Sequence, residues 1–335
     1  MKERYSYQAL ENIWTYKYLL FINTQYLKKI APEIHEIRYL WGISNNPNIP
    51  WNYIEQHIDK SWDWYTISLN PNISWNNVKD NINRNWWWGA LSYHPNITWD
   101  IINENPEYNW DEAGVSKNPN ITWDIVISNP YYNWSYYRLS ENPNIKMEII
   151  EQNIDKEWNY QMISYNPNVT IDFIKRHINQ KWDWYNISKN PNISWDDIIN
   201  NLDLPWIWGS ISCNPNITWD IIVKNLNYDW CWKSLSEHPN ITWNTIINNP
   251  TYEWDIYHIS RNPNINMDIV QNNLHLNWSW EQLGGNTMEK GKKQWINEKR
   301  LKIIKTLQIQ RYWRKYTCNP QYKLAKKFIN KIYLQ

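Results

Sequence analysis

The sequence has little glycine and cysteine and lacks any long apolar run. Its 335 residues contain 7 Gly, about 2% against roughly 7% in average proteins. The 3 Cys form no CxxC pair and are too few to cross-link a chain of this length, which favours a reducing compartment. No apolar stretch is long enough to predict a membrane span, and the N-terminus lacks the apolar block of a signal peptide. We therefore expect a soluble, intracellular protein.

Aromatic side chains are abundant. The chain has 28 Trp and 24 Tyr, and hydrophobic residues make up 42% of it. This content is ample for a packed core, so the composition excludes disorder along the whole length.

The dominant feature is an internal repeat of 24 residues without insertion or deletion. Each repeat proline is followed by Asn and then Ile, or Val169 once, and Ser stands three residues before it. Trp follows each proline after fifteen residues, from Trp62 to Trp278. A fixed period of this length predicts a solenoid or propeller, whose units bury their apolar faces only by stacking. The ten prolines are Pro47, Pro71, Pro95, Pro119, Pro143, Pro167, Pro191, Pro215, Pro239 and Pro263.

Each unit contains the signals of two short helices. In one unit Thr98 is a good N-cap, Asp100 lies in the first turn, and Asn105 before a proline ends the helix. In the second half of the next unit Asn133 is a candidate cap, and another Asn-Pro pair ends that helix. A strand reading of Trp62-Asp63-Trp64 covers only three alternating positions. We predict an all-α, right-handed solenoid that mixes α and 3₁₀ helices.

Two resemblances rest on this repeat. The period and the Asn-Pro-Asn start resemble the leucine-rich repeat variant family, whose units alternate an α-helix with a 3₁₀ helix. The longer repeat motif Ser-x-Asn-Pro-Asn-Ile-Thr-Trp-Asp-x-Ile, over residues 41 to 286, resembles that of repeat proteins of mimivirus-like giant DNA viruses. These resemblances imply a viral repeat protein without enzymatic activity, located in the host cytoplasm or the virion.

The ends differ from the array. Residues 1 to 40 are predicted to be an N-terminal helical cap, residues 41 to 286 the ten-repeat solenoid, and residues 287 to 335 a basic helical segment. Residues 285 to 335 hold 14 Lys or Arg against 2 Glu, about +12. Since the whole chain is +1, residues 1 to 284 carry about −11. The net charge of the whole chain is therefore close to zero although its two parts carry large charges of opposite sign.

The basic segment supplies the candidate binding residues, for a polyanion or for a protein partner. Basic helices of this kind bind nucleic acid, acidic proteins or anionic lipid, and Ile309 to Lys315 partly matches an IQ motif for a calmodulin-type partner. An apolar stripe at Ala325, Phe328, Ile329 and Ile332 equally predicts a C-terminal cap with a solvated basic face. The candidate residues are Lys292, Lys293, Lys299, Arg300, Arg311, Arg314 and Lys315.

No pattern predicts catalysis, a metal or a cofactor. His94 and His238 replace the Asn before proline, and His57 and His177 replace the Asn that ends a first helix, so each is an isolated substitution within the repeat. The chain has no Gly-rich phosphate loop and no GxSxG elbow. The recurrent Trp is predicted to fill the core, and the Asn-Pro-Asn motif to form turns.

These features favour a non-enzymatic scaffold that binds a protein of unknown identity. Specificity is expected at positions that vary among units over a fixed frame. The alternative is a nucleic-acid or nucleoprotein packaging factor that acts through the basic segment; the oligomeric state is left open. The variable positions are the ninth after proline (Gln56, Asp80, Glu104, Ser128, Gln152, Arg176, Asn200 and Lys224) and a second group (Leu69, Tyr93, Lys117, Glu141 and Tyr165).

Overall fold

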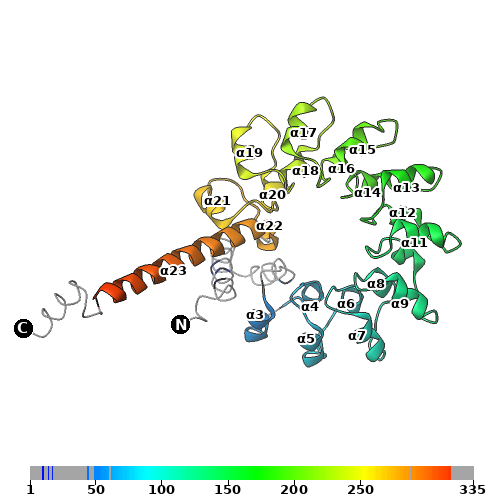
Figure 1. Cartoon of the computed structure of the whole chain (residues 1–335), viewed down its shortest axis with the longest axis horizontal. Helices are drawn as coiled ribbons and strands as arrows, with labels where there is room; N and C mark the ends of the chain where they lie inside the picture. The colour runs from blue at the N-terminus through cyan, green and yellow to red at the C-terminus, as the bar shows by residue number, and fades with distance from the viewer. Residues whose placement is uncertain are drawn as a thin grey trace, which may run out of the picture. The chain divides into compact units, whose positions relative to one another are not determined.

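The computed structural model describes Leu10, Trp14, Lys17, Ser44 and residues 49–59, 62–286 and 288–317. Within these residues the regular secondary structure is helical, with turns between the helices and no strand. Twenty short helices follow one another at the spacing of the repeat (Figure 1). The predicted fold class, an all-helical solenoid of repeats, is confirmed. The brief segments predicted as a mixture of α and 3₁₀ are assigned as α-helices throughout the described residues.

Each unit contributes one outer and one inner helix. Figure 1 shows the first helix of every unit on the outer side of a curve that runs from α3 to α22, and the second helix on its inner side. The outer helices are α3 (Trp51–Gln56), α5 (Trp75–Asp80), α7 (Trp99–Glu104), α9 (Trp123–Ser128), α11 (Met147–Gln152), α13 (Ile171–Arg176), α15 (Trp195–Ile199), α17 (Trp219–Lys224), α19 (Trp243–Asn248) and α21 (Met267–Asn272). The inner helices are α4 (Trp64–Ile67), α6 (Trp88–Ser92), α8 (Glu112–Lys117), α10 (Tyr136–Leu139), α12 (Tyr160–Ile163), α14 (Trp184–Ser188), α16 (Trp208–Ile211), α18 (Trp232–Ser236), α20 (Ile256–Ile259) and α22 (Trp280–Gly285).

Local capping sets the helix boundaries. The Thr98 side chain caps α7 by accepting from the backbone N–H of Ile101, and the amide of Asn105 donates to the carbonyl of Ile101 at 2.8 Å where the helix ends. The predicted cap at Asn133 is wrong: Ser135, two residues later, caps α10 by accepting from the N–H of Arg138. A hydroxyl side chain at the helix start serves this role as well as an amide.

Three aliphatic positions in every unit form the core. They lie two, seven and twenty residues after the repeat proline, and none of these thirty side chains is more than 6% exposed. One comes from the turn, one from the outer helix and one from the inner helix, as Ile97, Ile102 and Val115 illustrate. Since a unit has only these few core residues, its stability depends on the units beside it.

The Asn that stands before most repeat prolines bonds its unit to the preceding one. The buried amide of Asn118 donates to the carbonyls of Ser92, His94 and Ile97, at 2.9, 3.3 and 2.9 Å. Its side-chain oxygen accepts from the backbone N–H of Asn120 at 2.8 Å, which forms the turn. Two or three such bonds to the preceding unit recur at Asn70, Asn142, Asn166, Asn190, Asn214 and Asn262, and at Asn286, which has the same register but is followed by Thr.

The repeat Ser adds further hydrogen bonds between units. We call the Asn and Ser bonds together the hydrogen-bonded ladder. The Ser140 hydroxyl donates to the Tyr136 carbonyl at 2.7 Å and accepts from the Asn159 N–H of the next unit at 2.9 Å. Nine serines from Ser68 to Ser260 accept a backbone N–H nineteen residues later. The invariant polar residues therefore satisfy buried backbone groups between units.

The repeat Trp fills the space between the outer and inner helices. All ten Trp donate their indole N–H to the carbonyl five residues earlier, as Trp158 does to Asn153 at 2.7 Å. Six of them are buried, and Trp110, Trp134, Trp206 and Trp254 are half-buried. The assignment of this column to the core agrees with these positions.

The described residues fall into two compact units. One is the array up to Asn286. The other joins Leu10, Trp14 and Lys17 to residues 288–317, which include α23 (Glu289–Thr317). Within this second unit the Lys292 Nζ lies 5.7 Å from the ring centroid of Trp14, and the Lys17 Nζ lies 5.6 Å from that of Trp295. Most of the predicted N-terminal cap, including residues 18–40, lies outside the described residues.

Candidate binding surface on the inner helices

Exposed tyrosines line the inner helices. Five Tyr side chains there are about half exposed. Each lies on an inner helix or within two residues of its end. Figure 1 places these helices on the inner side of the curve. The five are Tyr65 (52%), Tyr137 (46%), Tyr165 (47%), Tyr185 (53%) and Tyr257 (46%).

Cations lie over several of these rings. The Lys189 Nζ is 4.3 Å from the ring centroid of Tyr185, and the Arg138 guanidinium is 5.3 Å from that of Tyr137. Near the first units Tyr65 instead stacks on Trp87, with centroids 4.1 Å apart and the planes within 9°. Aromatic rings paired with cations are a recurrent feature of protein interfaces.

Carboxylates neutralise some of these cations but not all. Glu141 is bound by Arg138 at 2.7 Å and by Lys117 of the preceding unit at 3.2 Å. Toward the C-terminal end of the array, Arg261 lies 3.5 Å from Glu237. Among the described residues, neither Lys189 nor Lys233 has a carboxylate within ion-pair distance.

The predicted variable positions divide between the two sides. The ninth residue after proline lies on or directly after the outer helices, and all eight named residues there are exposed. The second group lies at the end of the inner helices, where Tyr165 is exposed and Leu69, Tyr93, Lys117 and Glu141 are half-buried. The tyrosines of the inner helices other than Tyr165 were missed. Their signal in the sequence was Tyr recurring three residues after the repeat Trp, at Tyr65, Tyr137, Tyr185 and Tyr257.

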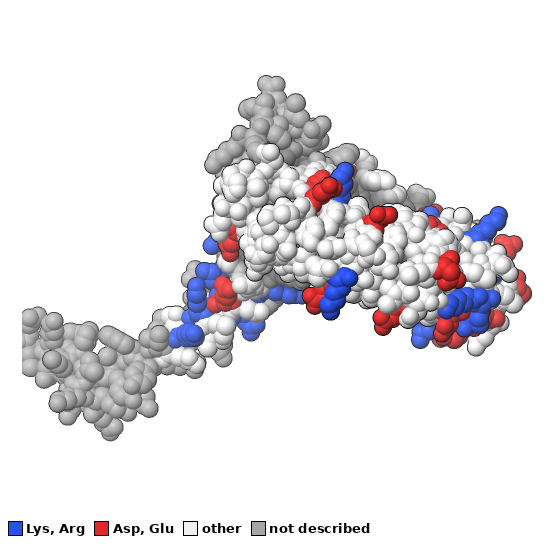
Figure 2. Space-filling model, turned by 90° about the horizontal axis from the view of Figure 1, so that it is seen from above, with Lys and Arg blue, Asp and Glu red and all other residues white. Residues whose placement is uncertain are grey.

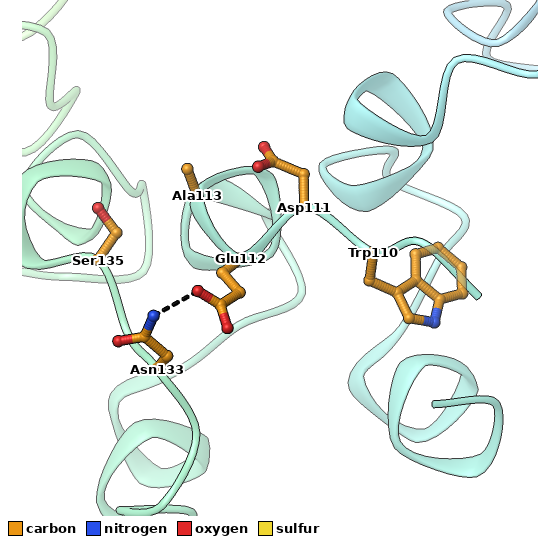
Figure 3. A pocket seen from close by; sticks show the side chains of 6 residues that line it. All are labelled: Trp110, Asp111, Glu112, Ala113, Asn133 and Ser135. Atoms are coloured by element: carbon orange, nitrogen blue, oxygen red, sulfur yellow. Dashed lines mark hydrogen bonds between the residues drawn. The ribbon is translucent and has the colours of Figure 1, made fainter. Parts of the chain in front are cut away.

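An open pocket of about 590 Å³ lies where one unit departs from the pattern (Figure 3). Eight of the ten units have Trp or Tyr two residues after the repeat Trp, whereas this unit has Glu112 there. The smaller side chains Glu112 and Ala113 therefore leave space beside the next unit, which supplies Asn133 and Ser135. The pocket is a consequence of the missing ring.

The polar groups of this pocket serve local structure. Asp111 caps α8 by accepting from the Gly114 N–H at 2.7 Å, Asn133 donates to Glu112, and Ser135 caps α10. Figure 3 shows Asp111 and Glu112 pointing in different directions. Burial, with Glu112 and then Asp111 adding to it, raises the pKa of nearby Tyr132 to about 12. The six lining residues do not place a nucleophile beside a base.

The ladder histidines keep two of the contacts that asparagine makes, one to the preceding unit and one within the turn. His94 Nε2 lies 3.1 Å from the Asn70 carbonyl, and its Nδ1 accepts from the Asn96 N–H at 3.1 Å. His238 makes the same pair of bonds. Burial lowers the pKa of both imidazoles, against the effect of the carbonyl contact, which raises it. Among the described residues no group of three or more His, Cys, Asp or Glu could hold a metal ion.

The candidate residues of the basic segment belong to α23, and their side chains differ in exposure and in contacts. Lys292 is only 7% exposed and lies over Trp14, while the Lys299 Nζ lies 5.5 Å from the Trp295 ring centroid. Lys293 and Arg300 are exposed. Arg311, Arg314 and Lys315 belong to α23, but their side chains, like the predicted C-terminal stripe after Thr317, lie outside the described part.

Charge on the array is interspersed. The face seen in Figure 2 is mostly uncharged, with acidic and basic side chains near one another. In the part of the chain that the structure describes, no helix is long and apolar enough to cross a membrane.

Comparisons with protein-family models, curated proteins and solved structures found no match.

Proposed function

We propose that this chain is a non-enzymatic repeat scaffold that binds a protein through its inner helices. The supporting observation is the set of five half-exposed tyrosines on or close to the inner helices, whose repeat aliphatic residue and the Ser after it are buried. Tyr provides a large contact area at a low cost in side-chain entropy and is enriched at interfaces. The proposed viral origin, with a location in the host cytoplasm or virion, rests on the resemblance of the repeat.

A peptide-display selection on the full chain tests this proposal. We expect the selected peptides to lose affinity when Tyr65, Tyr137 and Tyr257 are changed to Ala, because contact with the inner helices is lost. The matched control is Tyr131→Ala, since the Tyr131 side chain is fully exposed (101%) and follows an outer helix. Peptides that respond to Tyr131→Ala and not to the inner variants would contradict the proposal.

Nucleic-acid binding through α23 is the second candidate. It is favoured by the exposed basic side chains of Lys293, Arg300, Lys302 and Lys305 on one helix. If it holds, affinity for DNA or RNA falls steeply as salt rises, and replacing Arg300, Lys302 and Lys305 by Gln reduces the salt dependence for every sequence tested. Failure of the full chain to bind DNA or RNA at low salt would eliminate this candidate.

A further inference from the structure

The middle of the inner surface differs in charge from its two sides. We define the central patch as Tyr165, Tyr185, Lys189 and Lys233, which belong to the region from α12 to α18. On the N-terminal side Lys117 and Arg138 share Glu141. At the C-terminal border of the central region, Glu237 ends α18 and lies beside Arg261 of the next unit. The side regions thus neutralise their own cations, whereas no described carboxylate pairs with Lys189 or Lys233.

Two acidic residues, Asp183 and Glu237, stand at the ends of the central inner helices, and both have partners: Glu237 lies beside Arg261, and Asp183 is a helix cap. Asp183 begins α14 and accepts from the N–H groups of Tyr185 and Asn186 and from the Asn186 amide. These bonds hold its carboxylate at the helix start. Lys189 instead lies along the Tyr185 ring, so its ammonium group is already positioned beside an aromatic surface.

We propose that the central patch binds an acidic, extended segment of the protein partner. This rests on the proposed function and names the chemistry of the partner. Carboxylates of the segment pair with Lys189 and Lys233, and proline or other apolar side chains between them pack on Tyr165 and Tyr185, as in aromatic grooves that receive polyproline II segments. The array as a whole is acidic, but a Debye length of about 8 Å at physiological salt makes the local cations decisive.

Model peptides of repeating Glu-Pro, Gln-Pro and Lys-Pro dipeptides, each with a fluorescent label, provide the test on the full chain. We expect Glu-Pro to bind best, Gln-Pro roughly tenfold more weakly, and Lys-Pro not measurably. Glu-Pro affinity should also fall as salt rises, because the contact is between charges near the surface. Equal binding of Lys-Pro and Glu-Pro would overturn the inference.

Matched lysine variants locate the site. Lys189→Gln should weaken Glu-Pro binding roughly tenfold, because its ammonium group is held over the Tyr185 ring. Lys233→Gln should weaken it less, because its side chain is exposed and lies over none of the rings that the structure describes. The control is Lys224→Gln at the end of outer helix α17, which should leave the affinity unchanged. If Lys224→Gln acts like Lys189→Gln, the binding is nonspecific and the inference fails.

The outcome separates this inference from the proposed function. If display-selected peptides depend on the inner tyrosines but carry no excess of acidic residues, the protein-binding proposal stands and the acidic partner is wrong. If no peptide responds to the inner variants, both fail.

Discussion

The hydrogen-bonded ladder and the inner tyrosine surface use polar side chains for opposite purposes. In the ladder, Asn118 and Ser140 are fully buried, and each joins two units through backbone groups. On the inner surface, Tyr137 and Tyr185 are about half exposed and lie under cations. Residues that repeat without change therefore hold the frame, and residues that vary from unit to unit face outward. This division can be tested by substitutions in each region.

The largest effect is expected at the repeat Trp. Trp158→Ala removes a buried indole that contacts Tyr136 and Trp123 and donates to the Asn153 carbonyl, and should cost roughly 3–5 kcal/mol of unfolding free energy. Hydrogen exchange should rise in the mutated unit and its neighbours only, because each repeat contacts only the repeats beside it. The exposed Tyr131→Ala variant is the control. Unchanged exchange around residue 158 would show that this Trp is not part of the frame.

A smaller loss is expected in the ladder. Asn166→Ala removes the amide that donates to the carbonyls of Ser140, Asn142 and Ile145, and an unsatisfied buried group costs roughly 1–3 kcal/mol. The control is Asn179→Ala in the following loop, where the side chain is exposed. Thermal denaturation of both variants measures the difference. Equal midpoints would mean that the ladder does not stabilise the stacking of units.

The two ladder histidines predict a pH dependence. Because burial lowers their pKa in the folded state, the unfolded chain binds more protons below its His pKa of about 6.5. Stability is fully present above that pH and falls as the pH decreases toward the folded pKa, by up to about 1.4 kcal/mol per pH unit for each His. Changing His94 and His238 to Asn should remove this pH-dependent part of the stability. Melting curves recorded from about pH 7.5 to about pH 5, on both sides of the unfolded pKa of about 6.5, measure the difference. The same acid sensitivity in the double variant would contradict this account.

The smallest stability effect is expected on the inner surface. Tyr185→Ala should change the unfolding free energy by no more than about 0.5 kcal/mol, since the ring is 53% exposed. The same variant should weaken binding of display-selected peptides. A melting midpoint as low as that of Trp158→Ala would place Tyr185 in the frame and not in the binding surface.

The sequence predicts the frame well because the frame is repetitive. The 24-residue period, the Thr98 type of cap and the Asn-Pro helix ends follow from local rules, and the structure agrees with them. The bonds of Asn118 to three carbonyls of the previous unit could not be derived, because they depend on how units stack. The sequence predicted turn chemistry for this Asn, which is only half of its role.

The proposed binding surface is harder to predict, because the exposure of its side chains also depends on how the units stack. Recurrent Tyr two positions beyond a capping residue is compatible with core or surface, and only the stacked structure shows that Tyr137 and Tyr185 are exposed. The basic segment illustrates the reverse problem. Net charge marked Lys292 as a binding residue, yet its side chain is buried against Trp14 within the compact unit formed with the N-terminal residues.

The separation of frame from binding surface is tested most directly by comparing two variants of the full chain in one assay. One carries Ala at Tyr137, Tyr185 and Tyr257, and the other carries Asn166→Ala; thermal midpoint and affinity for a selected peptide are measured for each. The account predicts that the triple Tyr variant keeps its midpoint and loses binding, while Asn166→Ala lowers the midpoint and keeps binding at temperatures where it is folded. A triple Tyr variant that unfolds early yet still binds the peptide would contradict it.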